Sequence, residues 1–346
     1  MANFYIYAPD IHEGDAVGNH CIAIYRLANR LGFCTYIYAN QFSGFDEIRK
    51  WDNLNNENYT PNDILFISYS IYDPNIKNAL SKKLKTIIYC HNITPPKILI
   101  NSNPHTAELC KKGIEDLILL HKANLIIANS KKTKEDLSKV LKKIIHVIPP
   151  IASDMNFYSN IGKVLAPKTD GFTLNFTGRI EPNKNLEDLL EILAYLLSLN
   201  NKYKLIIVGK AENFEYLEKL KSLISYHQIQ HAVIFKGFVC INDLIYEYNK
   251  CDAFVTTSFH EGFCVPVHEM MTLGKASFIK KGGNAAEEFI YNPENTILGE
   301  DNYQNAINID KKLPLLLKQS DLIKKKSIEI LELTKDKNWG DLIKNT

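Results

Sequence analysis

Two glutamates flank a short turn-forming segment in 259-FHEGFCVPVHEM-270. Carboxylates placed in this way can bind a metal ion, act as a general acid and base, or accept hydrogen bonds from the hydroxyl groups of a ligand. Zinc is disfavoured, because a zinc-binding helix carries two histidines four positions apart, and His260 and His268 are farther apart than that. The choice between the other uses of Glu261 and Glu269 depends on their surroundings.

A helix is expected to begin inside this segment. Pro266 suits the first turn of a helix, because it has no N–H to leave unpaired there, and Gly274 suits the helix end. Backbone amides at a helix N-terminus favour an anion. We therefore predict an anion site at the loop residues Gly262, Phe263, Cys264 and Val265.

Glu269 lies one turn into the predicted helix. A carboxyl group near a helix N-terminus and cations is expected to stay ionised, which disfavours a role as the general acid of a glycosidase. A structural role as the partner of the helix dipole remains an alternative. If the anion is a diphosphate, Glu261 and Glu269 can also accept hydrogen bonds from the sugars on its two sides.

A group of candidate cations follows the apolar run 172–176. Gly178 permits a sharp turn there, and Arg179 and Lys184 precede the next predicted helix. Arg offers a planar fork of donors and Lys a point charge, so the two form a candidate phosphate clamp. The alternative is an ordinary solvated loop between a strand and a helix.

The N-terminal half carries weaker signals. The loop 9-PDIHEGDAVGN-19 leads into a helix, and Gly14 and Gly18 in it let backbone amides approach a phosphate. This is not the pattern GxGxxG, and a tight turn is the alternative explanation. His91 directly follows an apolar run in 90-CHNITPP-96, where it is either a residue at the rim of a binding site or a hydrogen-bonded structural residue.

All these candidates follow short apolar runs that alternate with segments of helical period. Such alternation predicts parallel sheets covered on both faces. The runs are 3–8, 34–39, 63–68, 85–90, 124–129 and 144–149, then, after a linker at 149–171, 172–176, 204–209, 232–238, 252–258 and 276–281. Helices are expected at 22–31, 107–120, 133–141, 185–199, 212–226, 242–250, from Pro266 onward, and in the Lys-rich stretch 303–346.

The pattern predicts two doubly wound α/β domains with a cleft between them. Ligands of such sheets bind outside the carboxyl ends of the strands. We predict an N-terminal Rossmann-like domain at 1–160, a C-terminal Rossmann-like domain at 161–325, and a C-terminal helix at 326–346 that crosses back to the N-terminal domain.

The composition excludes several classes of protein. A formal net charge of +2 gives no case for nucleic-acid binding, and no run of 18 apolar residues predicts a membrane span. The N-terminus lacks the basic region of a signal peptide, and seven singly placed cysteines are typical of reduced cytosolic thiols. Lysine clusters at 131–134, 139–143 and 323–326 are expected to be solvated helix faces or contacts with an anionic membrane surface.

Together these motifs resemble those of the retaining glycosyltransferases of the GT-B fold, the group that includes bacterial glycogen synthase, sucrose synthase, and the lipopolysaccharide and mannosyl transferases. The similarity covers nearly the whole chain. It is carried by Glu261 and Glu269 in an E-x7-E motif, the Gly262-Phe263 loop, Gly178-Arg179 with Lys184, and 282-GGNAAEE-288. The loop 14–19 and the segment 90–96 are similar to one bacterial branch, described as hexosyltransferases of surface polysaccharide synthesis.

The resemblance implies a role for each residue. Arg179 and Lys184 would neutralise a donor diphosphate, Glu269 would hold the ribose, Glu261 would contact the donor sugar, and His91 would lie near the transferred sugar. The base would lie beside 237–239, and Cys264 stands where the family usually has a second glycine. The implied catalytic residues are His91, Arg179, Lys184 and Glu261, and the implied nucleotide-sugar-binding residues are Gly18, Gly178, Val239, Gly262, Phe263, Cys264, Val265 and Glu269.

The implied reaction moves a hexosyl group, of the mannose or glucose type, from a GDP- or UDP-sugar to a glycan or lipid-linked glycan acceptor. Retention by front-side displacement and closure of the domains are expected. No D-x-D motif occurs, so the two cations are expected to replace a metal ion, and no cofactor is implied. A related phosphorylase or epimerase, or a non-catalytic nucleotide-sugar-binding protein, is the alternative. We expect a cytoplasmic monomer or weak oligomer, with peripheral contact at the inner face of the membrane as an option.

Overall fold

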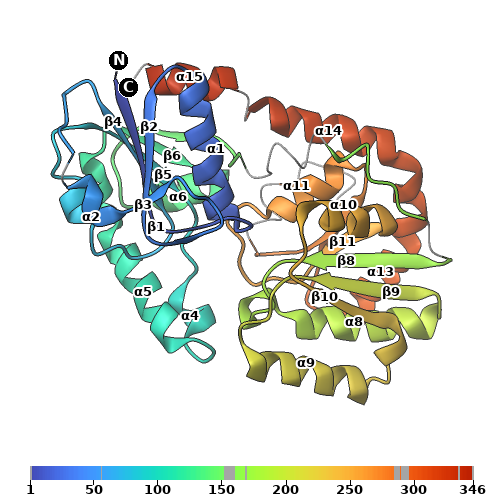
Figure 1. Ribbon diagram of the computed structural model, residues 1–346. Helices are drawn as coiled ribbons and strands as arrows, with labels where there is room; N and C mark the ends of the chain where they lie inside the picture. Colours follow the sequence, from blue (N-terminus) through green and yellow to red (C-terminus); the bar gives the residue numbers. More distant parts are fainter. Residues whose placement is uncertain are drawn as a thin grey trace. The chain divides into compact units, whose positions relative to one another are not determined.

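The computed structural model describes residues 2–55, 57–151, 160–167, 170–283, 289, 296–333 and 336–344. The chain divides into two compact units, unit 1 (Met1–Asp154 and Ile330–Thr346) and unit 2 (Met155–Glu329). Each unit has one parallel sheet with helices on both faces, as Figure 1 shows. The predicted fold class, two doubly wound α/β domains, is therefore confirmed.

The sheet of unit 1 has the strand order β3-β2-β1-β4-β5-β6-β7, and every neighbouring pair is parallel. The strands are β1 (Asn3–His12), β2 (Cys34–Ser43), β3 (Ile48–Lys50), β4 (Ile64–Tyr69), β5 (Lys85–Cys90), β6 (Leu125–Ala128) and β7 (Ile145–Val147). The order reverses between β1 and β4, which is where such sheets bind ligands. Among these strands of unit 1, β3 alone is not predicted by the sequence, because its three residues carry a single buried apolar side chain.

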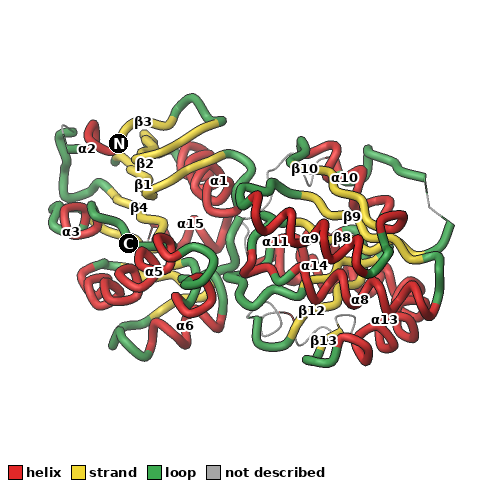
Figure 2. The backbone as a smooth tube through the Cα atoms, turned by 90° about the horizontal axis from the view of Figure 1, so that it is seen from below, coloured by secondary structure: helices red, strands yellow, loops and turns green. Residues whose placement is uncertain are grey.

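Helices cover both faces of this sheet (Figure 2). They are α1 (Ala16–Arg30), α2 (Trp51–Leu54), α3 (Ile76–Ala79), α4 (Pro96–Leu99), α5 (Pro104–Glu115), the 3-10 helix η1 (Asp116–Lys122), α6 (Lys131–Ser138) and α15 (Asp336–Lys344). Successive side chains of β1 point to opposite faces. Tyr5 and Tyr7 therefore pack in one core with α5 and α6, while Phe4 and Ile6 pack in another with α1 and α15.

Helices α1, α5 and α6 of unit 1 begin earlier than their apolar periodicity predicts. Asp15 caps α1 by accepting a hydrogen bond from the N–H of Val17, and Asn103 caps α5 by accepting one from the N–H of Thr106. Capping side chains satisfy the first backbone donors, so a helix starts at its cap rather than at its first buried residue.

The sheet of unit 2 has the order β10-β9-β8-β11-β12-β13, again all parallel. The strands are β8 (Phe172–Thr177), β9 (Tyr203–Val208), β10 (Val233–Gly237), β11 (Ala253–Thr256), β12 (Ala276–Lys280) and β13 (Thr296–Leu298). The helical segments are η2 (Pro182–Lys184), α8 (Leu186–Leu199), α9 (Phe214–Tyr226), η3 (Gln230–Ala232), α10 (Ile241–Lys250), α11 (Val265–Thr272), α13 (Asn302–Leu316), η4 (Leu317–Gln319) and α14 (Ser320–Leu333), whose residues from Ile330 onward belong to unit 1. The order reverses between β8 and β11.

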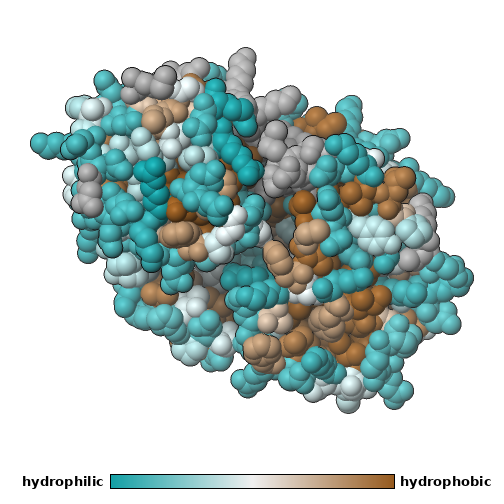
Figure 3. Space-filling view, in the orientation of Figure 1, coloured by the Kyte–Doolittle hydropathy of each residue, from teal (hydrophilic) through white to brown (hydrophobic). Residues whose placement is uncertain are grey.

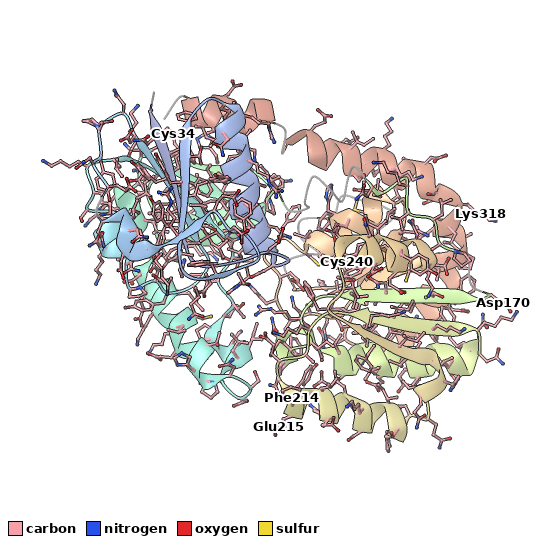
Figure 4. All side chains as sticks on the ribbon, in the orientation of Figure 1. Cys34, Asp170, Phe214, Glu215, Cys240 and Lys318 are labelled. Carbon is pink, nitrogen blue, oxygen red and sulfur yellow. The ribbon has the colours of Figure 1, made fainter. Side chains whose placement is uncertain are left out.

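The surface of unit 2 carries several exposed apolar side chains. Ile234 on the edge strand β10 and Phe238 after it are 38% and 67% exposed, and Figure 3 shows apolar surface, in brown, on the visible face of unit 2. Figure 4 shows Phe214 and Glu215 pointing outward at the start of α9.

No helix in the described part of the chain is long and apolar enough to cross a membrane. All seven cysteines are free thiols.

Three glycines draw the turns after β8, β9 and β10 together. The N–H of Gly178 donates to the carbonyl oxygen of Val208, and the N–H of Gly209 donates to the carbonyl oxygen of Gly237, both at 2.9 Å. A Cβ on Gly209 would lie 1.8 Å from the carbonyl oxygen of Gly178. Only glycine therefore allows this approach, which fixes the turn that carries Arg179.

We expect Gly209→Ala to lower the unfolding free energy of the chain by about 2 to 4 kcal/mol, because the added methyl group must push the Gly178 turn away. Gly237→Ala is the matched control. Its φ is +67° and nothing lies within 4 Å of the added Cβ, so only a backbone cost of about 1 kcal/mol remains. Urea unfolding followed by circular dichroism measures both, and equal losses would contradict the close approach.

Candidate functional site

The switch point of unit 2 brings two oppositely charged side chains together. Lys184 ends η2, after β8, and Glu261 lies in the loop after β11. Lys184 Nζ lies 2.8 Å from Glu261 Oε1, and the two side chains are only 15% and 13% exposed. Water screens a sheltered pair of this kind weakly, so the loss of either partner would leave a poorly solvated charge.

The Lys184 turn is held in place by Asn185. Asn185 has φ 50° and ψ 51°, a left-handed conformation that asparagine tolerates better than most residues. Its Nδ2 donates to Asp188 Oδ2 at 2.6 Å and to the carbonyl oxygen of Thr257 at 3.3 Å, and Thr257 Oγ1 donates back to the Asn185 carbonyl oxygen at 2.7 Å. Buried Lys280 on β12 pairs with the same Asp188 at 2.7 Å. The turn after β8 is thus tied to β11 and β12.

The Glu261 turn is held by Gly283. The N–H of Glu261 donates to the carbonyl oxygen of Gly283 at 2.8 Å. A Cβ at Gly283 would lie 2.5 Å from the carbonyl oxygen of Ser258, so the position favours glycine. This is the second glycine of the motif expected at 282–288, of which residues 284–288 lie outside the described residues.

The predicted helix N-terminus is present. Helix α11 begins at Val265 with Pro266 in its first turn, as expected. Its N-cap, Cys264, has φ 60° and ψ 68°, and the left-handed conformation costs a residue with a Cβ about 1 to 2 kcal/mol. Burial, with Glu261 nearby, raises the pKa of the Cys264 thiol well above its usual value, so the thiol stays protonated and is a poor nucleophile. Backbone geometry thus explains why glycine would suit this position.

Glu269 has a partner that the sequence did not suggest. The hydroxyl of Tyr248 on α10 donates to Glu269 Oε2 at 2.8 Å, and both residues are buried. Burial, and then the charge of Glu269, raise the pKa of Tyr248 well above its usual value. The hydrogen bond orients the carboxylate. In the sequence, Tyr248 shows only the helical spacing of a buried face.

The remaining predicted residues of unit 2 lie at the same edge of the sheet. Arg179 is exposed in the turn after β8, where its charge partly offsets the rise that burial causes in the pKa of Glu181. Val239 is half-buried after β10, and Gly178 is half-buried before Arg179. Arg179 and Lys184 carry two positive formal charges, and Glu261 and Glu269 carry two negative ones, so these four side chains sum to no net charge. Because Lys184 is paired with Glu261, an anion preference rests on the α11 N-terminus and on the exposed Arg179.

His91 and Gly18 belong to unit 1. His91 follows β5, and its Nε2 lies 3.0 Å from Ser68 Oγ. Burial lowers the pKa of His91 to about 4, so its ring is neutral at neutral pH. Gly18 lies in the first turns of α1, where a Cβ would lie 2.0 Å from the carbonyl oxygen of His12. Packing therefore accounts for this glycine, and its contact with a nucleotide sugar stays a prediction.

The two histidines of the opening segment are buried. The Nε2 of His268 on α11 lies 3.1 Å from the carbonyl oxygen of Ser327 on α14, to which it donates. Burial lowers the pKa of His268 to about 4. Within the described ranges, no group of three or more His, Cys, Asp and Glu side chains is arranged to hold a metal ion.

Tyr248→Phe is expected to lower the unfolding free energy by about 1.5 to 3 kcal/mol, because a buried carboxylate loses a hydrogen-bond donor. Tyr226→Phe, at a side chain 80% exposed at the end of the preceding helix α9, is the control and should change little. Urea unfolding gives both values. An unchanged stability of Tyr248→Phe would mean that Glu269 does not depend on this bond.

The free energy of unfolding should also fall as the pH falls from 6.5 to 4. The unfolded chain takes up a proton on His268 in this range, whereas the folded chain does not until about pH 4, so one such group costs about 3 kcal/mol across the window. His268→Gln should remove this part of the pH dependence, and His231→Gln, at an exposed position in unit 2, should not. Denaturant midpoints at several pH values measure the slope, and identical slopes for all three proteins would refute the assignment.

Residues 158–329 match the family described as glycosyl transferases group 1. The serotype-specific mannosyltransferase WbdA of Escherichia coli is 29% identical in a match over 215 residues that covers 56% of this chain and 25% of WbdA, so the match spans only a quarter of that relative.

Two solved structures resemble the whole chain. Sucrose-phosphate synthase from Thermosynechococcus elongatus superposes with a TM-score of 0.76 at 14% identity, over 100% of this chain and 99% of that one. HepE from Anabaena, in complex with UDP-glucose, superposes with a TM-score of 0.74 at 16% identity, over 99% and 98%. At these identities the likeness shows the fold. Residues 158–329 are therefore a glycosyl transferases group 1 domain, and the chain has the GT-B fold.

Proposed function

We propose that the chain is a retaining glycosyltransferase that moves a hexosyl group from a nucleoside-diphosphate sugar to a glycan acceptor in the synthesis of surface polysaccharide or glycoconjugate. The observation that carries the proposal is the Lys184–Glu261 pair, 2.8 Å apart at the switch point of unit 2. The family of the domain, the name of WbdA as a mannosyltransferase and the UDP-glucose in the HepE structure support it.

The leaving diphosphate gains negative charge as the glycosidic bond breaks. Arg179, Lys184 and the N-terminus of α11 bind that charge more strongly in the transition state than before it, which lowers the barrier. A diphosphate that reaches Lys184 competes with Glu261 for the ammonium group. Glu261 can then accept hydrogen bonds from the hydroxyl groups of the donor sugar.

The nucleoside end of the donor lies, in this proposal, on the side of Glu269. Tyr248 holds one oxygen of that carboxylate at 2.8 Å, and a carboxylate accepts several hydrogen bonds, so ribose hydroxyls can bind as well. The base lies beside Val239, after β10, and the phosphates lie over Gly178 and the amides of Phe263, Cys264 and Val265. The cations of the site take the place of a metal ion in this scheme.

His91 of unit 1 serves the acceptor side in this scheme. Its ring is neutral at neutral pH, because burial lowers its pKa to about 4, so it can accept or donate a hydrogen bond to a sugar hydroxyl without adding charge. Configuration is retained by displacement on the front face, with the leaving phosphate helping to take the proton of the acceptor hydroxyl. The buried, protonated Cys264 is not used as a nucleophile.

Arg179→Ala should lower kcat/KM for transfer by about a hundredfold, which is about 2.7 kcal/mol of transition-state stabilisation. Its unfolding free energy should stay unchanged, because the side chain is exposed. Lys202→Ala removes an exposed cation that pairs with Asp170 at the amino edge of β9, and it is the matched control. The assay measures nucleoside diphosphate released from UDP-glucose and GDP-mannose with a glycan acceptor.

Three results of that assay would reject the proposal. Full transfer activity in Arg179→Ala would show that Arg179 does not stabilise the leaving diphosphate. Turnover that needs free phosphate and no sugar nucleotide would make the chain a phosphorylase. Tight binding of a sugar nucleotide without turnover on any acceptor would make it a binding protein.

A further inference from the structure

A buried aromatic cluster surrounds His20 in unit 1. His20 lies near the start of α1 and has no exposed surface. Its ring centroid lies 4.2 Å from that of Tyr89, 5.6 Å from that of Trp339 and 6.0 Å from that of Phe66. Tyr89 is the next-to-last residue of β5, and Trp339 belongs to α15, so the cluster joins three parts of the chain that are far apart in sequence.

His20 contacts unit 1 close to both places where the chain crosses to unit 2. The chain leaves unit 1 after Asp154 and returns at Ile330. Just before the first crossing, the N–H of Ile151 donates to His20 Nδ1 at 3.0 Å. Just after the second crossing, Trp339 packs against His20, and Figure 1 shows its helix α15 beside α1. One side chain thus anchors the unit 1 ends of both connections.

The same cluster reaches His91. The His91 ring lies 5.0 Å from that of Tyr89 at an interplanar angle of 72°, and 5.9 Å from that of His20 at 79°. Ser68 Oγ is within hydrogen-bond distance of His91 Nε2, at 3.0 Å. Edge-to-face packing of rings fixes their relative orientation. The orientation of His91 therefore depends on the position of His20 and Tyr89.

The histidine at position 20 satisfies one backbone donor and brings a buried donor of its own. Because Nδ1 accepts from Ile151, the neutral ring carries its proton on Nε2, and that N–H has no hydrogen-bond partner in the described part of the chain. The indole N–H of Trp339 lacks one there as well. A buried donor without an acceptor destabilises a fold. A phenylalanine would remove this donor, but it would also leave the N–H of Ile151 without its acceptor.

We propose that His20 is a positioning residue that anchors both inter-unit connections to unit 1 and orients the ring of His91 for glycosyl transfer. The part concerning transfer rests on the proposed function, whereas the anchoring part does not.

Two substitutions separate the two contacts of His20. His20→Phe keeps a ring against Trp339 and Tyr89 but removes the acceptor for the N–H of Ile151. His20→Asn keeps an acceptor at the place of Nδ1 but removes the ring. Both are made in full-length chains with Trp51→Phe, which leaves Trp339 as the single tryptophan, since the chain has two. His105→Asn, at an exposed position of unit 1, is the control.

The anchoring part is measured without any assay of activity. In His20→Phe, hydrogen exchange at the Ile151 amide should speed up by about fivefold, the factor set by one hydrogen bond, while Trp339 stays shielded from acrylamide. In His20→Asn, acrylamide should quench Trp339 more strongly while the Ile151 amide stays slow. If neither variant changes either signal relative to His105→Asn, the anchoring is wrong.

The positioning part is measured by kinetics with UDP-glucose or GDP-mannose. Both variants should lower kcat by about tenfold or more and leave KM for the donor unchanged, because Arg179, Lys184 and the other residues that bind the donor in the proposed scheme lie in unit 2. If exchange or quenching changes in a variant but its kcat does not, His20 has a structural role alone, and its proposed role in positioning His91 is wrong. If either variant fails to fold, Trp339→Leu replaces it. Its kcat should fall by the same factor, and an unchanged kcat would again overturn the positioning role. Absence of transfer in the wild-type chain would reject the proposed function and with it the role in transfer, while exchange and quenching still decide the anchoring.

Discussion

The ion pair of Lys184 and Glu261 is the interaction on which the candidate site depends. It joins the turns after β8 and β11, the two strands between which the strand order of unit 2 reverses. While the pair is closed, its charges cancel, so the edge of the sheet can hold a sheltered lysine without a ligand. When an anion competes for the ammonium group, Lys184 is available to the anion. Glu261 is then available to accept hydrogen bonds from a hydroxyl-bearing group next to the anion.

Several residues around this pair lie at positions whose backbone conformation or close contacts favour glycine. Asn185 and Cys264 both adopt left-handed backbone conformations that favour glycine, and Gly283 lies where a Cβ would strike Ser258. Such departures cluster where function constrains a chain more tightly than folding does. Two of these positions are bonded to the turns of the ion pair: Asn185 exchanges hydrogen bonds with Thr257, and Gly283 accepts one from the N–H of Glu261.

Sequence reasoning predicted the parts of the molecule that follow from periodicity and from single residues with strong preferences. Continuous apolar runs predicted every long strand, and Pro266 predicted the start of α11, because its missing N–H restricts where it can stand. Contacts between distant segments leave no such trace. Tyr248 looks like any buried helical tyrosine, and the three-residue strands β3 and β13 carry too few side chains to show a period.

A crystal structure of the chain with UDP-glucose or GDP-mannose tests the central claim most directly. Our account predicts the diphosphate within hydrogen-bond distance of Arg179, Lys184 and the first amides of α11, with Lys184 Nζ moved away from its position 2.8 Å from Glu261. A diphosphate bound elsewhere, for example over the Gly14 to Gly18 loop of unit 1 with the Lys184–Glu261 pair intact, would contradict it.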